Sequence, residues 1–167
     1  MVLAIAGLIM AVVFLAVPQL QRSARDSQRK DLVSRIKSEI ETYASNNQGT
    51  YPLNTSGGNC DGTYTTGNWD DFYCRYVSNQ FNDKDPTTGN SIFGASSSTA
   101  SPVSCGVSSG ICTVTLPASG VATVIYSAKC NGAIAINSGG APTPATHNYA
   151  IVVGLDRANT YYCIDNV

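Results

Sequence analysis

Six cysteines are the residues of this 167-residue chain whose chemistry is easiest to predict. An even number of cysteines in loop-rich sequence is typical of disulfides, which form outside the reducing cytoplasm. A zinc site is not indicated, because the chain has no C-x-x-C pair and only one histidine. We therefore expect three disulfides that join Cys60, Cys74, Cys105, Cys112, Cys130 and Cys163.

The pairing of these cysteines stays open, because six cysteines can be joined in many ways. Cys60 and Cys74 enclose a turn-rich stretch, which they are expected to tie together. The next two cysteines flank the tight turn GVSSGI. A bridge between Cys130 and Cys163 would pin the C-terminal strand to the rest of a sheet.

The turn between the middle cysteines, Gly106 to Gly110, matches the G-x-S-x-G pattern of hydrolase nucleophiles. That pattern needs a strand–turn–helix context with a histidine and an acid elsewhere. Here it lies in a short Ser/Gly-rich loop, and the single histidine, His147, has no companion ligand or base near it in sequence. We therefore predict no enzyme activity, no catalytic residue and no cofactor.

Two aspartates offer oxygen ligands for a cation. Asp83 and Asp85 lie close together in a turn-rich stretch that ends at Gly89. The terminal acidic residue of an EF-hand loop is missing, so an ordinary turn is the favoured interpretation. Asp83 and Asp85 remain weak candidates, and no metal site is predicted.

The charges are few and unevenly distributed. Residues 1–50 carry six Lys/Arg against four Asp/Glu, whereas residues 51–167 carry four against seven. The C-terminal part therefore lacks the basic surface that nucleic-acid binding requires, and no nucleic-acid partner is expected.

These residues must be positioned by two elements, of which the first is a long helix. Residues 1–20 carry no charge, and the charged sequence that follows continues without a break to Asn46. We predict one helix over residues 1–46, roughly 70 Å long, which ends at the Asn-Asn-Gln-Gly stretch. A bend or loosening is expected at Pro18, with Gly7 as a second weak point. The apolar first half includes Leu3, Ile5, Gly7, Leu8, Val12, Phe14, Leu15 and Pro18.

The second half of this helix is amphipathic. Apolar residues recur at three- and four-residue spacing and form one stripe, which indicates a face packed on a core. The stripe consists of Leu32, Val33, Ile36, Ile40 and Tyr43.

The apolar first half is long enough to span a membrane. Four cations between Arg22 and Lys30 follow it, and the positive-inside rule alone would place its C-terminal side in the cytoplasm. The cysteines indicate the opposite orientation. A short basic leader before Met1 would reverse the charge comparison, and we expect such a leader to precede it.

The second element is a head of α+β class, and the expected division is residues 1–50 for the helical stalk and 51–167 for the head. Residues 51–102 are turn-rich, with a short helix expected around Trp69 to Asn79. Strands are expected at Ile111–Leu116, Val121–Ser127, Asn148–Leu155 and Thr160–Asp165. They would form a small antiparallel sheet of three or four strands, packed on the apolar stripe of the helix.

The arrangement resembles the type IV pilins and the related pseudopilins. The residues that carry this resemblance run from Ala4 to Pro52, AIAGLIMAVVFLAVPQLQRSARDSQRKDLVSRIKSEIETYASNNQGTYP. They resemble the pilin N-terminal helix in its glycine, proline, arginine-rich shoulder and closing NNQGTYP. Cys130 and Cys163 resemble the pilin C-terminal disulfide pair. The peptidase site and early glutamate of the family are absent, and we expect both to lie before Met1.

The resemblance implies a filament subunit, made as a single-pass protein of the cytoplasmic membrane and polymerised into an extracellular pilus for adhesion and twitching motility. It implies self-association through the N-terminal helix, and partners that include a prepilin peptidase and cytoplasmic ATPases. The arginine-rich shoulder could bind anionic lipid, but acids of neighbouring subunits are expected to neutralise it. The alternatives are a pseudopilin of a secretion system and a monomeric membrane-anchored binding module.

Overall fold

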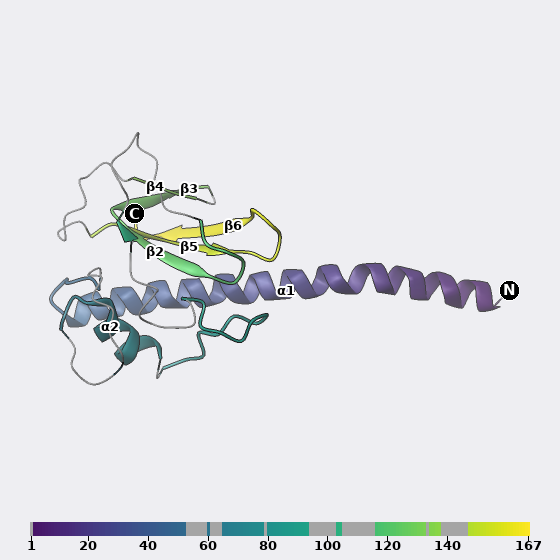
Figure 1. Ribbon diagram of the computed structural model, residues 1–167, viewed down its shortest axis with the longest axis horizontal. Coiled ribbons are helices and arrows are strands. Elements are labelled where there is room, and N and C mark those ends of the chain that lie inside the picture. Colours follow the sequence, from purple (N-terminus) through teal and green to yellow (C-terminus); the bar gives the residue numbers. More distant parts are fainter. Residues whose placement is uncertain are drawn as a thin grey trace.

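A computed structural model describes residues 2–52, 60, 65–78, 80–93, 103–104, 116–132, 134–137 and 147–167. The chain is α+β, with a long N-terminal helix packed on a small sheet, as the sequence predicts. The first half of the helix extends away from the head, and its second half lies between the sheet and a short helical segment (Figure 1).

Helix α1 runs from Val2 to Asn46. It ends where Gln48 and Gly49 adopt positive φ values of 57° and 81°, and the Gly49 N–H donates to the carbonyl of Ala44 at 2.8 Å. This is the stop that the Asn-Asn-Gln-Gly stretch predicts.

Pro18 lies inside α1, and the helix continues through it without a break. A proline removes a single backbone hydrogen bond, and here the flanking turns remain helical. A distortion between Gly7 and Pro18 in an assembled state stays a prediction.

The main sheet has the strand order β1-β2-β5-β6. Its antiparallel part consists of β2 (Ala122–Tyr126), β5 (Tyr149–Gly154) and β6 (Tyr161–Asp165), close to the predicted bounds. The short β1 (Val103–Ser104) adds to β2 in parallel. The strand predicted at residues 111–116 lies almost entirely outside the described residues.

A second hairpin was not predicted. Strands β3 (Ala128–Asn131) and β4 (Ile134–Asn137) pair with each other, with Cys130 opposite Ala135. Ser127 separates β2 from β3 with a φ of 56°, and this left-handed residue turns the chain out of the main sheet. The hairpin was missed because both strands are short and lack the long apolar runs of β2 and β5.

The head packs in layers on the two faces of the main sheet. On one face Val124, Ile151 and Val153 join Ile36 and Ile40 of α1 in the larger core cluster. On the other face a smaller cluster joins the sheet to the β3–β4 hairpin. The predicted stripe of α1 is therefore the helix side of the core: Val33, Ile36, Ile40 and Tyr43 are buried, and Leu32 is partly buried against them.

The helical segment on the other side of α1 consists of α2 (Trp69–Phe72) and the π-helical turn η1 (Tyr73–Val77), where a short helix was expected. Two disulfides lie among the described residues. Cys60 is bonded to Cys74 of η1, and Cys130 of β3 is bonded to Cys163 of β6, so the second bond ties the hairpin to the last strand. Both agree with the expected pairs, whereas Cys105 and Cys112 lie outside the described residues.

Candidate functional site

The first candidate site is the apolar segment, residues 3–20 of α1. Its described side chains are exposed, with exposed fractions of 89% for Leu3, 79% for Phe14 and 74% for Leu15. The segment projects beyond the head rather than lying along it (Figure 1). The other large exposed hydrophobic residues here are Ile5, Leu8, Ile9, Met10, Val12, Val13, Val17 and Leu20.

An apolar helical surface of this extent is not stable facing water. Eighteen residues of helix span about 27 Å, which is close to the thickness of a bilayer's hydrocarbon core. Helix α1 is long and apolar enough to cross a membrane. The segment could therefore anchor the chain in a membrane or pack against other helices.

The second feature is the arginine clasp, which joins α1 to the head and consists of Arg25, Asp26, Arg29, Asp85 and Asp156. Arg29 is 1% exposed, and it is the first buried residue along α1, whose earlier described side chains are exposed or, at Arg25 and Asp26, half-buried. Its Nε donates to Asp85 Oδ2 at 2.6 Å and its Nη1 donates to Asp156 Oδ1 at 2.7 Å. A single guanidinium thus joins α1 to two distant parts of the head.

The aspartates of the clasp are held from several sides. Asp85 Oδ1 accepts hydrogen bonds from the backbone N–H groups of Thr87 and Thr88, each at 2.9 Å. Gly120, at a φ of 75°, lies so close that an added Cβ would come within 2.7 Å of the Asp85 carboxyl. The site around Asp85 therefore requires a glycine at that position.

The turn between β5 and β6 is held against α1 by Asp156. Its carboxylate accepts hydrogen bonds from Arg25, whose Nε lies 2.8 Å away, and from Arg29. Its backbone N–H donates to Asp26 Oδ1 at 2.8 Å. Both the side chain and the backbone of Asp156 are therefore bound to the helix.

The ion pairs of the clasp favour the charged forms. Burial alone would raise the pKa of Asp85, but the hydrogen bonds from Arg29 and from the Thr88 and Thr87 N–H groups hold it below its usual value. The pKa of Asp156 is likewise lowered, because Arg25 and Arg29 outweigh the effect of burial. Burial disfavours the charge on Arg29, yet its two aspartate partners raise its pKa.

The clasp corrects one expectation. We expected acids of neighbouring subunits to neutralise the arginine-rich shoulder, but Arg25 and Arg29 are neutralised by Asp85 and Asp156 of their own chain. For Arg22 and Lys30 the expectation stays a prediction. The signal that could have revealed this lies in the helix spacing. Arg29 precedes Val33 by four residues and Ile36 by seven, so it continues the buried stripe.

Two tyrosines hold the far end of α1. The Tyr43 hydroxyl donates to Asp71 Oδ2 at 2.8 Å, and the Tyr149 hydroxyl donates to Glu41 Oε1 at 2.7 Å. Burial is the main cause that raises the pKa of both phenols, and the neighbouring carboxylates add to it. Both tyrosines are neutral donors that serve the packing of the helix.

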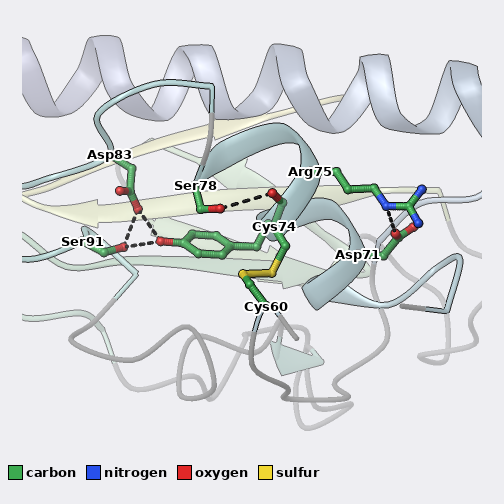
Figure 2. Close-up of a disulfide and its surroundings, with 8 residues drawn as sticks. Cys60, Asp71, Cys74, Arg75, Ser78, Asp83 and Ser91 are labelled. Atoms are coloured by element: carbon green, nitrogen blue, oxygen red, sulfur yellow. Dashed lines mark hydrogen bonds and ion pairs between the residues drawn. A yellow bond between two sulfur atoms is a disulfide. The ribbon is translucent and has the colours of Figure 1, made fainter. Parts of the chain in front are cut away.

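The two weak metal candidates have structural partners. Asp83 Oδ2 accepts hydrogen bonds from the Tyr73 hydroxyl, at 3.0 Å, and from the Ser91 hydroxyl, and Figure 2 shows these bonds as dashed lines. Asp85 belongs to the arginine clasp, so the two carboxylates are bound to different groups. Within the part of the chain that is described, no group of three or more His, Cys, Asp and Glu residues could hold a metal ion.

The hydrolase-like turn, Gly106 to Gly110, lies outside the described residues. His147 is exposed at the entry to β5, where its ring meets the edge of Tyr51 at a centroid distance of 5.5 Å. This contact is an aromatic packing contact. It brings no nucleophile to the histidine.

The chain is thus an α+β protein with one long, half-exposed apolar helix and a disulfide-bonded head. Searches for similar proteins find no match among family models, curated proteins or solved structures.

Proposed function

We propose that this protein is a structural subunit that polymerises through the apolar segment of α1 into an extracellular filament of the type IV pilus kind. The observation that carries the proposal is the contrast along α1. Residues 33–44 supply the helix side of the head core, whereas residues 3–20 are exposed on all faces. A helix that is apolar all round needs a partner on every side.

Copies of the same helix provide that partner in a filament. Parallel packing of many apolar segments would bury them along a central axis and leave the heads outside. Repetition of one head-to-tail contact produces an open helical polymer. Before assembly, the same segment would hold each subunit in the cytoplasmic membrane with the disulfide-bonded head outside the cytoplasm. Processing by a prepilin peptidase and extraction by ATPase-driven machinery belong to this proposal.

Cysteine cross-linking in producing cells tests self-association, because the described part of α1 contains no natural cysteine. A Val12→Cys variant should form disulfide-linked dimers on mild oxidation, because each chain then offers one thiol at the proposed helix contact. The matched control is Ser38→Cys, at an exposed position beside the head core, where fewer dimers are expected.

Electron microscopy of material sheared from the same cells distinguishes the outcomes. Surface filaments that contain the protein support the proposal. Val12→Cys dimers without surface filaments would favour a pseudopilin of a secretion system. A dimer yield no higher than that of Ser38→Cys, with no filaments, would overturn the proposal in favour of a monomeric anchored module.

A further inference from the structure

A basic hollow lies beside the arginine clasp, at the point where the apolar segment ends. It has a volume of about 480 Å³ and is formed by one face of α1 and the turn between β5 and β6. Its charged lining consists of Arg22, Lys30, Arg157 and Asp26. The uncharged lining residues are Gln19, Ser23, Ser27 and Thr160.

The hollow is positively charged because three cations line it against one acid, and that acid is turned toward the clasp. Asp26 Oδ1 accepts hydrogen bonds from Arg29 and from the Asp156 backbone. Lys30 lies over the ring of Tyr162, 5.5 Å from its centroid, a contact that leaves its charge in place. Among the ion pairs of the described residues, none involves Arg22 or Arg157. Three cations therefore surround a space with hydroxyl and amide groups.

The hollow is held in place by the clasp. Arg157 follows Asp156, whose side chain and backbone are both bonded to α1. The turn is closed by hydrogen bonds from Leu155 N to Thr160 O at 2.9 Å and from Thr160 N to Arg157 O at 3.1 Å. This geometry brings a cation from the C-terminal part of the chain to the helical face that presents Arg22 and Lys30. The site is complete within one chain.

We propose that this hollow binds the head group of an anionic phospholipid while the chain is held in the membrane. The inference rests on the membrane stage of the proposed function. With residues 3–20 in the hydrocarbon core, Arg22 would lie about 3 Å above Leu20 along the helix and Lys30 about 15 Å above it, in the head-group region. Basic residues at that depth attract anionic lipid.

An acidic side chain of a second copy would meet the same charges, but the position favours lipid. The hollow adjoins the end of the apolar segment, where lipid head groups surround any membrane-held chain. Its hydroxyl and amide groups suit a phosphate, which accepts several hydrogen bonds. It needs no second copy for its formation.

The test uses the full chain in neutral detergent micelles, with bound lipid counted by native mass spectrometry. Phosphatidylglycerol should bind more tightly than phosphatidylcholine. Each basic residue near the membrane surface contributes about 1 kcal/mol to the binding of anionic lipid. Arg157→Gln and Arg22→Gln should therefore each weaken the binding of phosphatidylglycerol about fivefold. Binding of phosphatidylcholine should not change.

Lys129→Gln is the matched control, since it removes the same charge from an exposed position on β3. Equal binding of the two lipids, or an equal loss in the control, would overturn the proposal. Loss of chain dimers in Arg157→Gln with unchanged lipid binding would assign the hollow to a second copy. Binding of inorganic phosphate as tight as that of phosphatidylglycerol would assign it to a free anion.

This experiment is independent of filament assembly, because native mass spectrometry counts the lipid bound to the monomeric chain separately from that bound to any dimer. A chain that prefers phosphatidylglycerol but gives no Val12→Cys dimers above the Ser38→Cys control would support the lipid site and overturn the filament. Dimers above that control without a lipid preference would support the filament and overturn the lipid site. Unfolding followed by the fluorescence of Trp69, the only tryptophan, confirms that each variant is folded.

Discussion

The two halves of α1 are one continuous helix with opposite relations to the rest of the chain. Residues 3–20 are apolar on every face and exposed, whereas residues 29–44 are apolar on one face and packed on the head. Helix propensity does not distinguish them, since both halves are helical. The difference lies in the pattern of apolar residues. One stripe suits a helix that meets one surface, and an apolar surface all round suits a helix surrounded by partners.

The arginine clasp marks the boundary between the halves. Arg29 is the first buried residue along α1, and its side chain is charged rather than apolar. A buried charge is tolerated only when it is paired and hydrogen-bonded. The clasp therefore fixes where the head begins along the helix, and hence how far the apolar segment projects.

Breaking the arginine clasp should cause the largest loss of stability where the head attaches to α1. Arg29→Met leaves the buried Asp85 without its ion-pair partner and leaves Asp156 with Arg25 alone, and removal of one member of a buried ion pair costs about 3 to 5 kcal/mol. The free energy of unfolding of the full chain in micelles, followed by Trp69 fluorescence, should fall by that amount.

Arg22→Met is the control for this change, because Arg22 is exposed on the same helix. Its effect on the free energy of unfolding should stay within about 0.5 kcal/mol. Equal losses in the two variants would show that the clasp contributes nothing specific to the attachment of the head.

The same substitution in both halves sharpens the comparison. Ile36→Ala removes a fully buried side chain from the core and should lower the free energy of unfolding by about 2 to 5 kcal/mol. Ile9→Ala, where the side chain is 58% exposed, should change it by less than about 0.5 kcal/mol. The measurement is the same fluorescence-detected unfolding. A loss at Ile9 as large as that at Ile36 would mean that the apolar segment belongs to the folded head.

The division of α1 into an exposed apolar half and a half packed on the head could largely be predicted from the sequence, because it follows from the spacing of the apolar residues. The buried stripe from Val33 to Tyr43 and strands β2, β5 and β6 follow from apolar spacing alone. The clasp could not be predicted in the same way. Arg29, Asp85 and Asp156 are far apart in the chain, and their meeting depends on how three segments pack. Charged residues carry no periodic signal that says which partner they have.

The β3–β4 hairpin shows a second limit. Its formation depends on Ser127 in a left-handed conformation, which propensity disfavours and which tertiary packing must stabilise. The basic hollow likewise depends on tertiary packing. Lys30 and Arg157 are 127 residues apart in sequence, and only the docking of the β5–β6 turn on α1 places them together.

Acid should lower the stability of the contact between the second half of α1 and the head by a smaller amount, and it should leave the apolar half unaffected. The pKa values of Asp85 and Asp156 are lowered in the folded chain, so their ion pairs stabilise it above the unfolded carboxyl pKa of about 3.9. This contribution is lost as the pH falls from about 5 through that value toward the lower folded pKa values. The midpoint of thermal unfolding should therefore decline across that range. Residues 1–20 contain no charged group, so their partition into micelles should not change with pH.

Asp85→Asn separates this effect from general acid unfolding. The variant should be less stable at neutral pH, because Arg29 loses a charged partner, and its thermal midpoint should decline less steeply between pH 5 and pH 3, roughly the range in which carboxylates titrate. Asp31→Asn, at an exposed position of α1, should keep the steeper decline of the unmodified chain. If both variants keep that slope, the pH dependence arises outside the clasp, and the boundary between the two halves of α1 does not depend on the charge of Asp85.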